Sequence, residues 1–114
     1  MPFINSKVTV AMSAEQKERV KSKLGKAIEL IPGKTESWLM VGFEDCYTLY
    51  FQGNQNDETA FVEVKIFGTA SAGAYDVLTD KICEIFYEEL KIPKERIYVK
   101  YEEVSNWGWN GNNF

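Results

Sequence analysis

Two halves of the chain repeat one order of elements, and this repeat restricts the fold more than any other feature. The stretch ELIPGKTESWLMV runs from a helix end through Ile-Pro and a basic residue into a strand, and ELKIPKERIYVKY does the same about sixty residues later. Such a repeat predicts two β-α-β units, each with parallel outer strands. We therefore expect an α+β fold in a single domain over residues 1–114, with a four-stranded mixed sheet and two helices on one face.

Apolar and β-branched runs mark the strands of this sheet. The predicted ranges are Pro2–Val10, Trp38–Phe43, Phe61–Phe67 and Arg96–Tyr101, and Tyr47–Phe51 is expected to extend the second strand. Alternation along these strands predicts a second apolar face, turned away from the helices. A monomer that exposed such a face would be prone to aggregate, so we expect copies of the chain to associate.

Two helical segments carry apolar residues at a spacing of three or four. The first begins after Ser13, which forms a capping box with Gln16, and ends at Pro32-Gly33. The second follows Gly68–Gly73 and ends at Ile92-Pro93. The predicted buried positions are Val20, Leu24, Ala27, Ile28 and Ile31 in the first helix, and Tyr75, Leu78, Ile82, Ile85, Phe86 and Leu90 in the second.

The absence of histidine from the chain removes several kinds of site from consideration. A Cys-His dyad and a Ser-His-Asp triad both need it, and Cys46 and Cys83 lack the CxxC spacing of a zinc site. We expect no metal, no cofactor and two buried thiols. The chemistry must then use amines, carboxylates, tyrosines or backbone groups.

Charge and hydropathy argue against a nucleic-acid or membrane partner. The net charge is -4, and no stripe of Lys and Arg is interleaved with aromatic residues. No apolar run approaches the roughly 20 residues that a membrane helix needs. The first residues lack the basic and apolar regions of a secretory signal. These features predict a cytoplasmic protein, or one that is secreted without a signal peptide.

Five short motifs occur together in the chain: Pro2, Gly33-Lys34, Phe67-Gly68, Arg96-x-Tyr98 and Gly108-Trp109-Asn110. At these separations they resemble the macrophage migration inhibitory factor family of the tautomerase superfamily, and the similarity can be followed over essentially the whole chain. The resemblance implies a homotrimer of the doubled β-α-β fold. It also implies keto–enol tautomerisation of aromatic α-keto acids such as phenylpyruvate, and tautomerisation of dopachrome.

The resemblance gives each matching residue a role. Pro2, exposed as a free secondary amine once the initiator Met is removed, would be the catalytic base. Lys34 would bind the substrate carboxylate or the developing enolate, and Phe67 would offer its backbone N–H. Tyr98 would line the site from a neighbouring subunit. The apolar wall and the C-terminal tail would consist of Trp107, Trp109 and Phe114.

Catalysis by Pro2 requires an amine that is neutral near pH 7. An ordinary α-amine titrates at about 7.7–8.0, and a secondary amine is intrinsically more basic. Burial among aromatic side chains and the nearby charge of Lys34 would both lower the pKa of the Pro2 amine. A rigid neutral amine beside a cationic anchor can then move a proton on an enolisable keto acid.

Two departures from the family pattern limit these expectations. Thr59–Val62 stands where animal members carry CxxC, so we expect no thiol–disulfide activity. Lys100 replaces an asparagine two residues after the site tyrosine. If Lys100 points into the site, it adds a second cation that favours carboxylate-rich substrates. The animal cytokine role is therefore not carried over.

Other functions and simpler structural roles stay open. Lys34 suits a helix C-terminus, and Tyr98, Trp107 and Trp109 suit packing or an interface. The chain could be a cytokine-like homologue that binds a receptor or partner protein and keeps vestigial tautomerase activity. It could also hydrate or dehalogenate an unsaturated acid. That chemistry needs a carboxylate that activates water, and the candidates are Glu63, Glu102 and Glu103.

The C-terminal tail NWGWNGNNF is expected to take part in assembly. Trp107 and Trp109 flank Gly108, as in a short edge strand that pairs with a neighbour's sheet. Such pairing would place Tyr98 and Lys100 of one subunit beside Pro2 of the next. The activity should then depend on the trimer.

Overall fold

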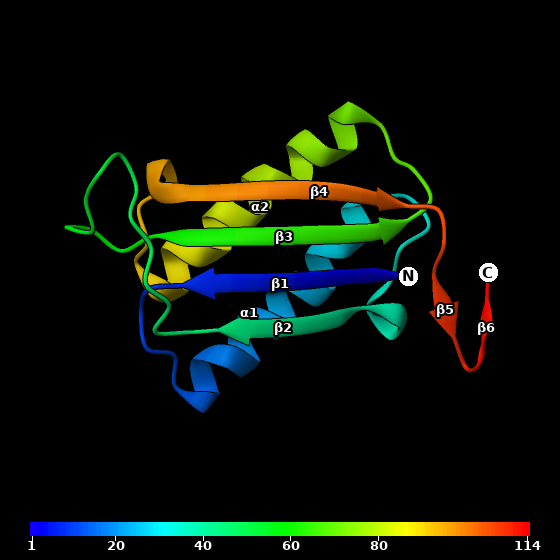
Figure 1. Ribbon diagram of the computed structural model, residues 1–114, viewed down its shortest axis with the longest axis horizontal. Helices are drawn as coiled ribbons and strands as arrows, with labels where there is room; N and C mark the ends of the chain where they lie inside the picture. The colour runs from blue at the N-terminus through cyan, green and yellow to red at the C-terminus, as the bar shows by residue number, and fades with distance from the viewer.

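Four strands and two long helices follow one another in the order that the repeat predicts (Figure 1). The computed structural model describes residues 1–114. Its main sheet contains β1 (Pro2–Val8), β2 (Met40–Glu44), β3 (Ala60–Phe67) and β4 (Ile97–Val104), in the order β2-β1-β3-β4. β1 is parallel to β2 and antiparallel to β3, and β3 is parallel to β4. The prediction of a four-stranded mixed sheet is therefore confirmed.

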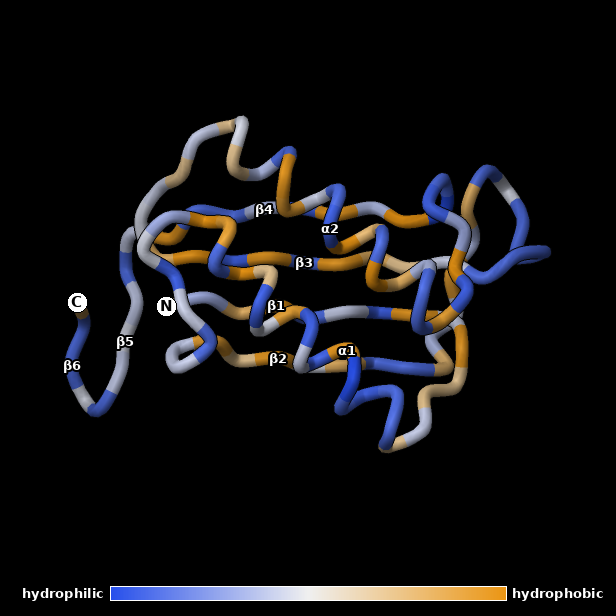
Figure 2. The backbone as a smooth tube through the Cα atoms, turned by 180° about the vertical axis from the view of Figure 1, so that it is seen from behind, coloured by the Kyte–Doolittle hydropathy of each residue, from blue (hydrophilic) through white to orange (hydrophobic).

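The helices α1 (Ala14–Ala27) and α2 (Ala72–Leu90) lie across the same face of the sheet (Figures 1 and 2). The predicted capping box is present at the start of α1. The Ser13 hydroxyl accepts the Gln16 N–H at 3.1 Å, and the Gln16 side chain accepts the Ser13 N–H at 2.9 Å. Ser71 caps α2 in a similar way. These bonds satisfy backbone donors that the first helical turn leaves free. Neither helix has the length and apolar character needed to cross a membrane.

One hydrophobic core fills the space between the helices and the sheet. Every second residue of β1 and β3 is buried, which is the period of strands with one covered face. Figure 2 shows hydrophobic segments along α2 and β3, whereas the C-terminal tail is mostly hydrophilic. The core residues are Ile4, Val8, Met12, Val20, Leu24, Ala27, Ile28, Ile31, Ala60, Val62, Val64, Ile66, Leu78, Ile82, Ile85, Phe86, Leu90, Ile92 and Ile97. The buried helix positions are confirmed, except that Tyr75 is half-buried.

A tight turn after α1 fixes the direction in which Lys34 leaves the helix. The chain first continues as a 3-10 turn over Ile28–Leu30. Pro32 and Gly33 then occupy the centre of a β-turn, which the Lys34 N–H closes by donating to the Ile31 carbonyl at 3.1 Å. Gly33 has a φ of 82°, and the third position of a type II turn requires such a positive value. The IPGK stretch therefore places a lysine at a defined point.

Two strand predictions are wrong around β2. The strand begins at Met40 rather than Trp38, because Glu36–Trp38 forms a 3-10 turn in front of it. Tyr47–Phe51 does not extend the strand, because Cys46 has a φ of 54° and turns the chain away. This stretch becomes part of a loop that connects β2 to β3.

The two cysteines lie in different surroundings. Cys83 is half-buried and packs against the core, and burial raises the pKa of its thiol. Cys46 is exposed, contrary to the prediction of a buried thiol. The reason is its position in the turn after β2, where no core side chain covers it.

The sheet face turned away from the helices is charged in its middle, not apolar as predicted. Lys7 lies 4.0 Å from Glu44 and 3.6 Å from Glu63, and Lys100 lies 2.9 Å from Glu102. Strands with only one covered face need apolar residues at every second position alone, so charges can occupy the others. The middle of this face therefore gives no apolar surface that association would bury.

The C-terminal tail forms a hairpin of its own rather than a single edge strand. β5 (Gly108–Trp109) pairs with β6 (Asn112–Asn113) in the antiparallel sense. Asn110 and Gly111 join them with φ values of 51° and 85°, the signs that a type I′ turn requires. The hairpin lies beyond the end of the sheet at which β1 begins (Figure 1).

Candidate active site

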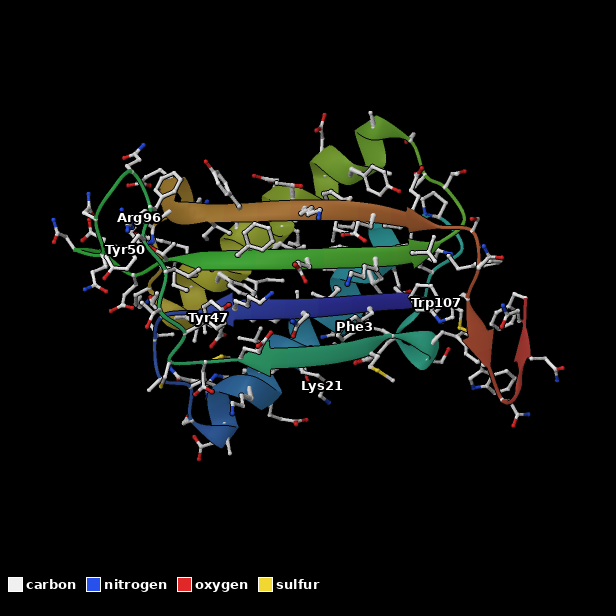
Figure 3. The ribbon with its side chains drawn as sticks, in the orientation of Figure 1. Phe3, Lys21, Tyr47, Tyr50, Arg96 and Trp107 are labelled. Atoms are coloured by element: carbon white, nitrogen blue, oxygen red, sulfur yellow. The ribbon has the colours of Figure 1, made fainter.

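A cavity of about 590 Å³ opens at the end of the sheet where β1 and β2 begin. The two strands are parallel and Phe3 pairs with Met40, so their first residues lie side by side. Figure 3 shows Trp107, from the tail after β4, at the same end of the molecule as Phe3. The lining residues are Met1, Pro2, Phe3, Ser37, Trp38, Leu39, Met40, Trp107, Gly108 and Trp109. Because most of them are apolar, the cavity favours an apolar or aromatic ligand.

Aromatic rings form a continuous wall beside this cavity. Trp38 meets Trp109 edge to face with ring centroids 5.1 Å apart. Trp109 stacks on Phe114 at 6.3 Å, and Phe114 lies 5.5 Å from Phe67. The Phe114 N–H donates to the Trp107 carbonyl at 3.0 Å, which holds the last residue against the hairpin. The structure therefore brings the tail residues expected in the apolar wall into contact with the ring of Phe67.

Lys34 and Phe67 meet directly beside the start of β1. The Lys34 ammonium donates to the Phe67 carbonyl at 2.7 Å, although the two residues lie 33 positions apart. The Phe67 N–H donates to the Met1 carbonyl at 2.9 Å. Met1 is thus common to the cavity and to this polar contact, while Pro2 lies buried behind it at the first position of β1. Neither Lys34 nor Phe67 lines the cavity itself while Met1 is in place.

The terminal amino group lies in surroundings that favour its neutral form. Burial lowers the pKa of the Met1 amine, and the positive charge of Lys34 lowers it further. Both effects act in the direction predicted for an amine at this place, because burial and a nearby cation each disfavour a second positive charge. This end of the chain therefore combines an apolar wall, a lysine and a less basic terminal amine.

Tyr98 and Lys100 lie away from Pro2 in the same chain. Pro2 is level with Glu103 across the sheet, since both pair with Ile66. Tyr98 is five residues from Glu103 along β4, or about 17 Å at the usual rise of a strand, and Lys100 is about 10 Å away. Tyr98 is exposed. One chain alone does not bring these two residues to the cavity.

The three acidic candidates have other partners. Glu63 pairs with Lys7, and Glu102 pairs with Lys100. Glu103 accepts the Tyr75 hydroxyl at 2.6 Å, and this bond is the main reason that the pKa of Glu103 is lowered. None of the three lines the cavity, and no group of three or more Cys, Asp or Glu side chains is placed to hold a metal ion. Within one chain, the geometry brings none of these three carboxylates to the cavity.

Trp38 and Met40 line the cavity, but no motif in the sequence identifies them as site residues. Both belong to an apolar run that is equally typical of a buried strand. The available signal is the β-α-β repeat itself, because parallel strands begin at the same end of a sheet. The first residues of the second strand are therefore expected beside Pro2 and Phe3.

The doubled β-α-β sheet and the proline at its buried start, beside an aromatic pocket and a lysine, define a protein of the tautomerase superfamily. The family model for macrophage migration inhibitory factor (MIF) matches residues 1–114. The chain therefore belongs to the MIF family, and the predicted resemblance is confirmed. Membership of this family supports a tautomerase or MIF-like role, binding of a small-molecule substrate, and oligomeric assembly.

Individual relatives agree with this assignment. Macrophage migration inhibitory factor from Xenopus laevis is 26% identical over 95 residues, which is 82% of each chain. The crystal structure of Leishmania major MIF2 superposes with a TM-score of 0.93 at 32% identity, covering 100% of this chain and 97% of that one. A macrophage migration inhibitory factor homologue from Prochlorococcus marinus gives a TM-score of 0.82 at 30% identity, with 98% of each chain covered.

We expect Lys34 to control the titration of the terminal amine. Replacement by the uncharged Lys34→Met removes a cation that opposes protonation, so the pKa of the amine should rise. The rate of N-terminal alkylation, which only the neutral amine undergoes, should then reach its half-maximum at a higher pH. Lys26→Met, at an exposed position of α1 that does not line the cavity, should leave the midpoint unchanged. Equal midpoints for both variants would contradict the electrostatic role of Lys34.

Proposed function

We propose that the protein is a cofactor-free keto–enol tautomerase that acts on aromatic α-keto acids, such as phenylpyruvate, and on dopachrome-like compounds. The Pro2 amine is the catalytic base, and it becomes free when Met1 is removed. The observation that carries the proposal is the position of Pro2, which is buried at the start of β1 between an aromatic cavity and the contact of Lys34 with Phe67.

Removal of Met1 changes three groups in this proposal at once. It converts the Pro2 nitrogen from an amide into a secondary amine. It frees the Phe67 N–H, which otherwise donates to the Met1 carbonyl. It also removes the residue that lines the cavity and lies beside the Lys34 ammonium. A substrate in the cavity would then reach a base, a cation and a backbone donor.

The proton transfer needs no other reagent. The neutral Pro2 amine takes a proton from the carbon beside the keto group, and the electron pair of that C–H bond forms the carbon–carbon double bond of an enolate. The enolate oxygen then takes the proton from protonated Pro2, which yields the enol and restores the amine. Lys34 and the Phe67 N–H stabilise negative charge as it develops on oxygen.

The surroundings of Pro2 support an aromatic substrate with one carboxylate. The rings of Trp38 and Trp109 offer an apolar surface, and Lys34 is the cation whose charge acts on the terminal amine, so a substrate carboxylate can meet it there. Lys100 pairs with Glu102 at 2.9 Å, so much of its charge is already compensated. We therefore propose monocarboxylates rather than dicarboxylates as preferred substrates.

Two separate apolar ends support a ring-shaped assembly. At the cavity end Trp38, Met40 and Trp109 are exposed, and at the opposite end Tyr50 and Tyr98 are exposed. Figure 3 shows Tyr50 far from Phe3 and Trp107. Two different patches on one chain favour a head-to-tail interface, which closes into a ring when the rotation allows it. We propose a homotrimer of this kind, in which Tyr98 and Lys100 of one subunit lie beside the Pro2 cavity of the next.

Activity should depend on a free amine at Pro2. We expect the enol–keto conversion of phenylpyruvate to fall at least tenfold in Pro2→Gly, because a primary amine on a flexible residue replaces a rigid secondary amine. Insertion of alanine between Met1 and Pro2 should have the same effect, because Pro2 then becomes an amide. Intact-mass measurement of each preparation identifies the terminal residue. Wild-type turnover in either variant, or in protein that retains Met1 throughout, would exclude Pro2 as the base.

Lys34 should act on the carboxylate of the substrate. In Lys34→Ala we expect the affinity for phenylpyruvate to fall about tenfold to a hundredfold, since a charge-assisted hydrogen bond contributes roughly 1.5–3 kcal/mol. The affinity for the methyl ester should change much less. Inhibition constants of both compounds, measured with wild type and variant, make the comparison. An equal loss for acid and ester would remove Lys34 from this role.

The assembly should respond to a charge at the Tyr50 end. We expect light scattering after size exclusion to give the mass of three chains for the wild type. Tyr50→Glu should dissociate this species and lower the activity together with it. Val77→Glu places the same charge at an exposed apolar position on α2 and should change neither quantity. A fully active wild type with the mass of one chain at micromolar concentration would refute the shared site.

A further inference from the structure

A buried arginine at the Tyr98 end of the sheet has no acidic partner. Arg96 ends the 3-10 turn Lys94–Arg96 that precedes β4, and only 6% of its surface is exposed. None of the ion pairs within 4.0 Å involves it. A buried guanidinium is normally paired, because the removal of an unpaired charge from water is costly. Arg96 instead bonds only to neutral groups.

These neutral groups belong to the loop between β2 and β3. Nε of Arg96 donates to the Thr59 hydroxyl at 2.9 Å, and the two terminal nitrogens donate to the side chain and the carbonyl of Asn54 at 3.5 and 3.3 Å. Asn54 closes a turn with Phe51 through two backbone bonds of 2.8 and 3.1 Å. The fork geometry of the guanidinium lets one side chain hold both the loop end and this turn. Arg96 thereby fixes the place of Phe51.

Phe51 is packed between Arg96 and Tyr98. The Arg96 guanidinium carbon lies 5.4 Å from the centre of the Phe51 ring, a cation–π distance. The Tyr98 ring meets the Phe51 ring edge to face, with an interplanar angle of 90° and centroids 5.1 Å apart. The three side chains form a cluster, called here the Arg96–Phe51–Tyr98 cluster. It runs from a buried charge to the exposed ring of Tyr98.

The ring of Tyr98 has space to move if its contact with Phe51 in this cluster is lost. A cavity of about 210 Å³ adjoins it, lined by Leu49, Tyr50, Phe51, Thr59, Ala60, Phe61, Arg96 and Tyr98. Tyr98 is otherwise exposed, and its hydroxyl group makes no hydrogen bond within the chain. Phe51 is the aromatic residue whose ring meets the Tyr98 ring directly, and this contact favours one orientation of it.

We propose that Arg96 is a positioning residue that acts through Phe51 to orient Tyr98 toward the active site of the neighbouring subunit. The inference rests on the proposed function, in which Tyr98 completes that site. It adds a role for the loop between β2 and β3, which otherwise has no part in the reaction. Arg96 touches neither the substrate nor Pro2, and its effect reaches the neighbouring site only through the orientation of Tyr98.

A double-mutant cycle tests this coupling. In Phe51→Leu, kcat/KM for phenylpyruvate should fall about threefold to tenfold, the range expected for an aromatic pair of this geometry. The trimer mass should not change. In a Tyr98→Leu background the same Phe51→Leu change should cause no further loss, because the ring that it positions is gone. Phe51→Tyr keeps an aromatic ring and should retain nearly all of the wild-type kcat/KM. If Phe51→Leu lowers kcat/KM by the same factor in the Tyr98→Leu background as in the wild type, the proposal is overturned.

A spectroscopic measurement tests the orientation of Tyr98 without an activity assay. In protein labelled with 3-fluorotyrosine, the 19F resonance that Tyr98→Phe removes identifies Tyr98. This resonance should shift in Arg96→Lys, which keeps the charge and the Phe51 ring but loses the planar fork of the guanidinium. Tyr87→Leu breaks a similar cation–π pair with Lys94 and should not move it. An unmoved Tyr98 resonance in Arg96→Lys would overturn the proposal. If the variant shows this shift but the wild-type protein has no tautomerase activity, the proposed function is contradicted instead.

Discussion

The central position of β1 in the sheet is the constraint on which the rest of the structure depends. β1 pairs on one side with β2 in parallel and on the other with β3 in the antiparallel sense. The start of β1 therefore lies between the start of β2 and the end of β3. This arrangement pairs Phe3 with Met40 on one side and Pro2 with Ile66, the neighbour of Phe67, on the other. The turn at Gly33 then brings Lys34 to the Phe67 carbonyl. A terminal residue, normally mobile, becomes buried and fixed.

Much of the fold could be predicted from the sequence, because the helix and strand periods are strong and the β-α-β unit appears twice. The capping box at Ser13, the buried helix faces and the strand pairing are all confirmed. The errors lie where local propensity is a poor guide. Trp38 is an apolar residue in a 3-10 turn, and a positive φ at Cys46 ends a run that looks like a strand. The charged outer sheet face was missed because alternation alone does not say which positions face water.

The candidate site could be predicted only in part, for a physical reason. Pro2, Lys34, Phe67 and the tail residues meet within one chain, and their spacing in sequence follows the family pattern. Tyr98 lies at the other end of its own sheet, so its contribution depends on contacts between chains. Sequence periodicity reports which side of an element is buried in one domain. It does not report which exposed aromatic residues a second subunit will cover.

The catalytic base is identified most directly by the atom that reacts with an electrophilic substrate analogue. An α-keto acid with a carbon–carbon triple bond beside its carbonyl adds covalently to a neutral amine held within the cavity. Intact mass followed by peptide mapping locates the product. We expect one adduct per chain, on the nitrogen of Pro2, formed in step with the loss of tautomerase activity. Adducts on Cys46 or on surface lysines alone, or full activity after complete modification of Pro2, would contradict it.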